Sequence, residues 1–260
     1  MNGVTEPDPL ENPTRFALEG AHASIAERKG RVLRYPADFC PFYGMPAEPT
    51  AQDWANAAAL AGPGGLVTLS ATTIPFPEEW ELVFGGRPGV QLVAGEQVGL
   101  TEPGDHAVPD DHAAPDDHAA PADDEVIQLG LADVPEVLDL VGRTQPGPFR
   151  QRTIEMGTYL GIRREGALVA MAGERLRPPG FTEISAVCTD EAWRGHGFGS
   201  RLTLAVAAGI RARGDVPFLH AVATNVNAIR LYEQLGFEHR RMTMFKTARV
   251  PGLARVGGEA

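Results

Sequence analysis

The sequence predicts an α/β protein of the α+β kind, in which helices cover a sheet, and three observations support this. Residues 182–189 form a β-rich run, a glycine-rich loop follows at 194–200, and residues 202–213 have the apolar spacing of an amphipathic helix. Residues 134–141 repeat that helical spacing directly after a strand-like run at 126–129. The 260 residues are 43% hydrophobic, which is enough for a sizeable core.

Helix and strand signals alternate along both halves of the chain. In the second half we expect strands at 126–129, 159–163, 167–175, 181–189 and 217–222, and a last strand ending at Phe245. We expect helices there that open at a capping box of Asp133 and Glu136, at 202–213, and after an N-cap at Asn227. In the first half we expect helices at 13–35 and 49–61 and strands at 66–69 and 90–93.

Composition divides the chain into four parts. We expect an N-terminal auxiliary αβ domain at 1–103, a disordered linker at 104–124, a second domain at 125–250 and a disordered tail at 251–260. The boundaries follow the shift from mixed apolar sequence to a polar segment and back.

The expected linker carries a six-residue repeat of Asp, His, Ala and Pro. It holds seven acidic and no basic side chains and no large apolar residue, so it should repel itself and stay unfolded. Weak binding of a divalent metal by His106, His112 and His118 with the neighbouring aspartates is the alternative. No closed ligand set is fixed in space there, and we expect no metal cofactor.

Charge and hydropathy exclude several classes of protein. The net charge is −11, yet residues 125–260 hold 17 basic and 14 acidic side chains, which suits a ligand with several phosphates. Nucleic acid is not an expected partner, because no basic stripe with interleaved aromatics is present. No apolar run approaches the ~18 residues of a membrane span, and the N-terminus lacks a basic signal region. With two cysteines and no disulfide framework, we expect a cytoplasmic protein.

The glycine-rich loop is the strongest functional signal. Its residues are Arg194, Gly195, His196, Gly197, Phe198, Gly199 and Ser200. Alternate glycines expose backbone N–H groups, and the following helix adds the positive end of its dipole, so the loop favours a bound phosphate or pyrophosphate. It fits neither the dinucleotide fingerprint, since the third glycine is missing, nor the P-loop, since no lysine is near. A tight turn without a ligand is the alternative.

A second motif supports the first. The pattern R-x-x-G-x-G on Arg194, Gly197 and Gly199 is followed, after one helix and one strand, by N-x-x-A-x-x-L-Y-E-x-L-G-F at residues 225–237. Together these motifs resemble the GNAT superfamily of N-acyltransferases, over about residues 126–247. The resemblance implies a mixed, mostly antiparallel sheet flanked by helices. The first half resembles, more weakly, the auxiliary half of two-part GNAT proteins.

The resemblance also implies a site for acetyl-CoA as co-substrate. The open edge of the fourth strand of the fold would be Val187, Cys188 and Thr189, and the loop from Arg194 to Ser200 would hold the pyrophosphate. Asn225 matches the asparagine that contacts CoA. Tyr232 matches the tyrosine that protonates the leaving thiolate, and a core tyrosine is the alternative. Cys188 would be a strand residue and no nucleophile.

Two residues compete for the role of general base. Glu183 lies at the position of the glutamate in histone-acetylating members, and a strand there would put Glu183, Ser185 and Val187 on one face. His220 lies near the position of a catalytic glutamate in members that acetylate amino termini. Deprotonation through water, needing neither, stays open. The acceptor would enter near residues 144–150, where Phe149 is expected to form a wall.

The function implied is transfer of an acetyl group to a primary amine of a small molecule or peptide by direct attack in a ternary complex. A non-catalytic acyl-CoA-binding module is the alternative, and transfer to oxygen or of a longer acyl chain is a third. The acidic first half favours a cationic acceptor. A homodimer is left open.

Overall fold

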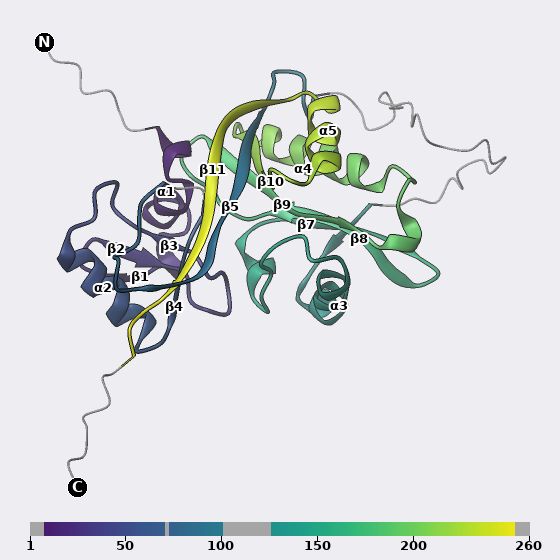
Figure 1. Cartoon of the computed structure of the whole chain (residues 1–260). Coiled ribbons are helices and arrows are strands. Elements are labelled where there is room, and N and C mark those ends of the chain that lie inside the picture. Colours follow the sequence, from purple (N-terminus) through teal and green to yellow (C-terminus); the bar gives the residue numbers. More distant parts are fainter. Residues whose placement is uncertain (1–7, 71–72, 101–125, 253–260) are drawn as a thin grey trace, which may run out of the picture.

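The computed structural model describes residues 8–70, 73–100 and 126–252 (Figure 1). The expected linker at 104–124, with its histidine repeat, lies outside these residues, as does the expected tail beyond residue 252. The boundaries of the expected domains stay a prediction.

The elements of the second half follow the expected order closely. They are β6 (Ile127–Leu129), α3 (Val134–Thr144), β7 (Tyr159–Arg164), β8 (Ala167–Glu174), β9 (Phe181–Thr189), α4 (Phe198–Ala212), β10 (Val216–Val222), α5 (Val226–Gln234) and β11 (Phe237–Arg249). Short 3₁₀ turns, η3 (Leu131–Asp133), η4 (Thr153–Met156) and η5 (Glu191–Trp193), join some of them.

The first half contributes smaller elements and two strands of the main sheet. Its elements are η1 (Pro9–Glu11), α1 (Pro13–Glu19), η2 (Ala23–Ile25), β1 (Glu27–Lys29), β2 (Val32–Arg34), β3 (Tyr43–Gly44), α2 (Ala51–Ala61), β4 (Leu66–Leu69) and β5 (Glu81–Ala94). Strands β1, β2 and β3 form a small antiparallel sheet of their own.

The main sheet joins both halves of the chain. Its order is β4-β11-β5-β10-β9-β8-β7-β6, and every neighbouring pair is antiparallel except β9 and β10. The expected mixed, mostly antiparallel sheet flanked by helices is therefore confirmed. In Figure 1, β5 runs beside β11 along most of its length, so a strand from the first half separates β10 from β11.

Helices α4 and α3 cover opposite faces of this sheet. The buried face of α4, which includes Leu202, Val206 and Ile210 as expected, packs with Ile184 of β9. The buried face of α3, which includes Val137, packs with residues such as Tyr159 and Met171 in a separate cluster. Figure 1 shows α4 above the sheet and α3 below it.

The expected helix at 13–35 is wrong beyond Glu19. Helix α1 ends at Glu19, with Gly20 as its C-cap, and the chain then forms the hairpin of β1 and β2. Lys29 pairs with Val32, so the hairpin turns through two residues, and Gly30 takes the positive φ of 56° that such a turn needs. The spacing of the apolar residues in this segment fits both a helix and a strand, and pairing in the folded chain selects the strands.

Two expected helix caps are also wrong. The Asp133 carboxylate accepts the Gly130 N–H at 2.8 Å and, with Glu136, pairs with Arg163 of β7, so no capping box opens α3. The N-cap of α5 is Asn225, whose side chain accepts the Ala228 N–H at 3.2 Å.

Candidate active site

The site begins where β9 and β10 separate. The two strands pair in parallel from Phe181 and Val216 as far as Ile184 and Leu219, and no pairing continues beyond. The edge of β9 that faces β10 therefore has no strand partner from Ser185 to Thr189 in the described structure. An unpaired edge presents N–H and C=O groups to an extended ligand.

A bulge in β9 shapes this open edge. Ala186 has a φ of 56°, and the residues 186 and 187 together oppose the single residue Ala172 of β8. As a result, Val187 packs in the cluster of Ile184 and α4, whereas Cys188 packs in the cluster of α3. The expectation that Glu183 and Val187 share one face is wrong, because the extra residue reverses the alternation.

The glycine loop lies at the N-terminus of α4. The first bond of the helix runs from the Arg201 N–H to the Gly197 carbonyl, so the N–H groups of Phe198, Gly199 and Ser200 have no acceptor within the helix. Gly197, the N-cap, has a φ of 73°, which an L side chain rarely adopts. The loop thus presents a cradle of free donors at a helix N-terminus.

Aromatic packing holds this loop in shape. The His196 Nδ1 donates to the carbonyls of Trp193 and Arg194, each at 3.1 Å. The His196 ring also contacts the rings of Trp193 and Phe198. His196 therefore stabilises the conformation of the loop.

Tyr232 of α5 lies in the same cleft as the loop. Its side chain is 7% exposed and packs among the residues of α4 and against Phe237. Burial raises the pKa of its hydroxyl to about 12, with a further increase from Cys188, so the hydroxyl stays protonated at neutral pH. Within the described residues the hydroxyl has no hydrogen-bond partner. It is free to donate to a ligand.

Cys188 also lies at this cleft, on the open edge of β9. Burial raises the pKa of its thiol to about 11, although a hydrogen bond with Thr144 opposes the rise. A thiol with so high a pKa is a poor nucleophile at neutral pH, which agrees with the expected structural role.

The two expected bases are brought together, but both are buried and engaged. The Glu183 carboxylate accepts two hydrogen bonds of 2.9 Å from the Arg175 guanidinium and one of 2.8 Å from His220 Nδ1. Glu183 is fully buried, which alone would raise its pKa; the Arg175 charge and these hydrogen bonds outweigh burial and lower the pKa to about 2. At that pKa the carboxylate is a very weak base.

The other nitrogen of His220 contacts Gln91 of β5. The Gln91 amide N–H₂ donates to the Leu10 carbonyl at 3.1 Å, and its oxygen accepts from Arg240 at 2.8 Å. This fixes which end of the amide faces the ring, so Gln91 donates to His220 Nε2 at 3.1 Å. The network therefore assigns the Nδ1–H tautomer to His220, with both nitrogens occupied.

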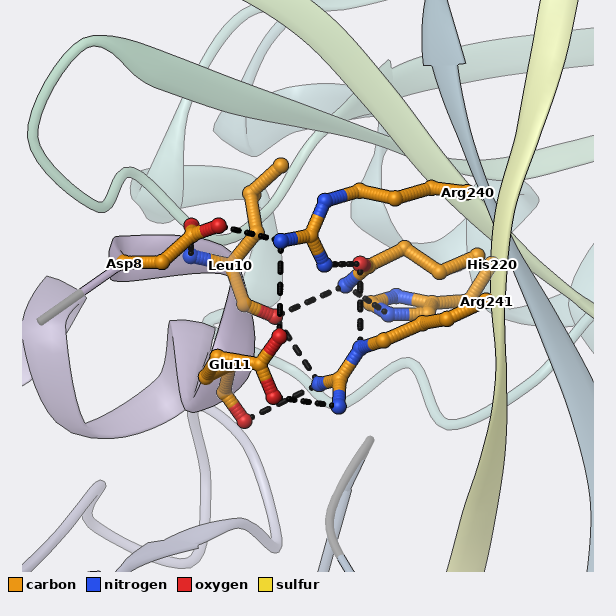
Figure 2. A network of polar contacts seen from close by, with 7 residues as sticks. Asp8, Leu10, Glu11, His220, Arg240 and Arg241 are labelled. Carbon is orange, nitrogen blue, oxygen red and sulfur yellow. Dashed lines mark hydrogen bonds and ion pairs between the residues drawn. The ribbon is translucent and has the colours of Figure 1, made fainter.

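A bulge in β11 completes this network. The register with β5 jumps between His239 and Arg241, so both Arg240 and Arg241 reach the Gln91 oxygen. Arg241 continues to the Leu10 carbonyl at 2.9 Å, and Arg240 pairs with Asp8 (Figure 2). Gln91 and Arg175 were not predicted, because their only local signal is a polar residue within an apolar run.

The expected acceptor loop lines the cleft, but Phe149 does not. Residues 144–148 and Arg150 face the cleft. Phe149 is 7% exposed and packs edge-to-face on Tyr159, with ring centroids 5.3 Å apart. The expected aromatic wall is instead supplied from the first half of the chain and from β11, by Phe42, Tyr43, Phe84 and Phe245.

All these parts border one continuous cleft of about 2300 Å³. It extends from the glycine loop past Tyr232 and the open edge of β9 to the segment 34–43. The described residues contain no cluster of three or more metal-ligating side chains, and none of their helices is long and apolar enough to cross a membrane.

Comparison with known proteins agrees with this architecture. Residues 159–246 match the family model described as FR47-like protein. An acetyltransferase assigned to the GNAT family, from Novosphingobium aromaticivorans, is 33% identical, with 93% of this chain and 98% of that chain covered and a TM-score of 0.74. The chain belongs to the GNAT family of acetyltransferases.

More distant GNAT structures share the fold. A GCN5-related N-acetyltransferase from Kribbella flavida is 18% identical over 95% of this chain and 97% of that one, with a TM-score of 0.55. A tandem GNAT protein from the clavulanic acid biosynthesis pathway is 15% identical over 87% and 82%, with a TM-score of 0.52. Among curated proteins, no sequence matches the chain.

The FR47-like family model covers β7 to most of β11, and so includes Glu183, the glycine loop and Tyr232. It does not include β5, which supplies Gln91, or the turn η1. The match to the Novosphingobium protein covers both halves of this chain.

Proposed function

We propose that this GNAT acetyltransferase transfers the acetyl group of acetyl-CoA to a primary amine of a small molecule or a peptide, by direct attack in a ternary complex. The observation that carries the proposal is the protonated Tyr232 hydroxyl, which opens onto the same cleft as the glycine loop and the free edge of β9. A cytoplasmic location and a possible homodimer stay predictions.

The donor set fits CoA. The free N–H groups at the start of α4, with Arg194 and Ser200 beside them, suit a pyrophosphate, and the unpaired edge of β9 suits an extended amide-bearing arm. The Asn225 side chain caps α5 with its oxygen, which leaves its N–H₂ for the ligand. Acetyl-CoA supplies an activated thioester when bound.

Different residues of the cleft position the donor and protonate the leaving group. The glycine loop and the β9 edge hold the donor in place, which converts the attack of the amine into a step within one complex. Tyr232 donates its proton to the departing sulfur, since a phenol held protonated is a competent acid for a thiolate.

We assign the loss of the ammonium proton to water in the cleft. Glu183 is fully buried beside Arg175, and the His220 nitrogens are both occupied, so neither is offered to the amine directly. Their role is to position β9 and β10 where the strands separate.

The pH profile tests this assignment. Because an ammonium must lose its proton before attack, kcat/KM should rise tenfold per pH unit and level off at the ammonium pKa of each acceptor. Acceptors whose pKa values differ by about two units should shift the profile by the same amount. A profile with the same midpoint for every acceptor would instead show that a group of the enzyme takes the proton.

The glycine loop can be tested separately. Gly197→Val should raise the KM for acetyl-CoA by about tenfold or more, because Val is strained at the positive φ by about 1–2 kcal/mol and its side chain enters the space of the cradle. Gly142→Ala is the matched control, since an added Cβ there meets no atom. Equal effects of the two variants on the KM for acetyl-CoA would show that the loop is not part of the CoA site.

Both expected bases are buried and occupied by hydrogen bonds within the protein. This favours one competing function, a non-catalytic acyl-CoA-binding module. A thiol-release assay over a broad amine panel separates the two, with acetyl-, succinyl- and fatty acyl-CoA as donors. Turnover with acetyl-CoA supports the enzyme. Tight binding of CoA with no thiol release from any amine supports the module.

A further inference from the structure

The cleft has two ends, which lie on opposite faces of the sheet. The glycine loop opens α4, which packs with Ile184 and Val187 on one face. The loop 144–150 follows α3, which packs with Cys188 on the other face. The CoA donors are at the first end, so the second end is left for the acceptor.

Every charged side chain that lines the cleft is cationic. These side chains are Arg34, Arg87, Arg150, Arg175, Arg194, Arg201, Arg230 and Lys246. No Asp or Glu of the described residues belongs to the lining. The cleft therefore differs from the chain as a whole, whose net charge is −11.

CoA phosphates would match Arg194, Arg201 and Arg230, which surround the start of α4 and α5. They do not account for the cations at the acceptor end. Those comprise Arg34, Arg87, Arg150, Arg175 and Lys246.

Three of the cations at the acceptor end already have partners. Arg34 pairs with Glu27 at 2.6 Å, Arg175 pairs with Glu183, and Lys246 donates to the Ile74 carbonyl at 2.7 Å. Arg87 and Arg150 are exposed, and neither has a carboxylate partner in the described part of the chain. The Arg87 guanidinium lies over the Phe84 ring, 5.5 Å from its centroid, a contact that does not use its N–H donors. The N–H groups of both guanidinium groups are thus left to a ligand.

Arg87 lies beside the buried network of Glu183, His220 and Gln91. Arg87 is opposite Phe245 in the β5–β11 register, and the Phe245 ring contacts His220, with centroids 5.8 Å apart. Alternation along β5 puts Arg87 on the same face as Gln91. The charge of Arg150, like that of Arg175, acts on the buried thiol of Cys40.

We propose that Arg87 and Arg150 bind the acid group of the acceptor, which is an amine that carries a carboxylate or a phosphate. This rests on the proposed acetyl transfer and narrows its substrate class. A guanidinium binds both acids through charge-assisted hydrogen bonds, and a concave site strengthens the attraction. An amine without an acid group would bring a further positive charge to a lining that is already cationic. The sequence-based expectation of a cationic acceptor is thereby replaced.

The experiment uses the full chain, acetyl-CoA and matched amines. One arm pairs α-amino acids with their carboxamides, a second pairs an aminoalkyl phosphate with the aminoalkyl alcohol, and a third contains diamines. The acid-bearing member of each pair should have a kcat/KM at least tenfold higher when both members are compared at the plateaus of their pH profiles, and the first two arms distinguish carboxylate from phosphate.

Variants link the preference to the two arginines. Arg87→Gln and Arg150→Gln should each raise the KM for the acid-bearing amine by about ten- to hundredfold, with little change for its neutral partner or for acetyl-CoA. Arg28→Gln, an exposed arginine outside the cleft lining, is the control for net charge. Arg150→Glu should shift the preference toward diamines.

The outcomes distinguish a failure of this inference from a failure of the proposed function on which it rests. If no amine of any class is acetylated, the proposed function fails. If neutral amines or diamines are acetylated as well as acid-bearing ones, or if the two Gln variants leave the preference unchanged, acetyl transfer stands and the acid-binding site is overturned.

Discussion

Tyr232→Phe is expected to lower kcat by about a hundredfold or more and to leave the affinity for CoA unchanged. General acid catalysis typically contributes about 10²- to 10⁴-fold, and this substitution removes the donating proton while keeping the ring that packs against α4 and Phe237. Because burial raises the Tyr232 pKa to about 12, the wild-type rate should show no loss of the acid form below about pH 11.

Steady-state kinetics and CoA titration of the same preparations check this. Tyr159→Phe is the matched control, since the buried Tyr159 hydroxyl has no hydrogen-bond partner among the described residues and does not line the cleft. The control should retain full activity. A Tyr232→Phe enzyme with wild-type kcat would show that this hydroxyl is only a packing group.

The second large effect is expected on stability. Arg175→Met should lower the free energy of unfolding by about 3–5 kcal/mol, because it leaves the Glu183 carboxylate buried without its main partner. In a protein of this size that corresponds to a fall in Tm of roughly 10 °C. Thermal unfolding followed by circular dichroism measures it.

The double variant Arg175→Met with Glu183→Leu should recover most of the loss, because no uncompensated charge is then buried. If the single and double variants unfold at the same temperature, the ion pair contributes nothing specific. Recovery of Tm without recovery of activity would show that the pair also positions β9.

The pH dependence of stability follows from the same pair. The folded pKa of Glu183 is about 2, below the value of about 4.5 expected in the unfolded chain. A depressed carboxyl pKa gives stability that is fully present above pH 4.5 and is lost as pH falls toward 2. Wild type should lose stability in that window, and the double variant should lose about 3 kcal/mol less.

The order of elements after residue 126 was predictable from local signals. The turns, the glycine stops and the apolar periods of α3, α4 and α5 are all short-range features, and so are the two motifs that indicate a CoA site. The exact caps were less predictable, because Asp133 pairs with Arg163 of β7 instead of capping α3.

The position of β5 between β10 and β11 could not be read from local sequence. Its pairing with β10 joins residues more than 120 positions apart, and only the folded sheet shows that Gln91 faces His220. Likewise, the two bulges at Ala186 and Arg240 change which side chains share a face, and an alternating pattern gives no sign of them. The expected bases were therefore found, but their burial was not.

A crystal structure of the protein with bound CoA would test the central claim most directly. We predict the pyrophosphate on the N–H groups that open α4, the pantetheine arm along the edge of β9 from Ser185 to Thr189, and the sulfur within about 3.5 Å of the Tyr232 hydroxyl. A CoA molecule bound outside the cleft between β9 and β10, or with its sulfur remote from Tyr232, would contradict the account.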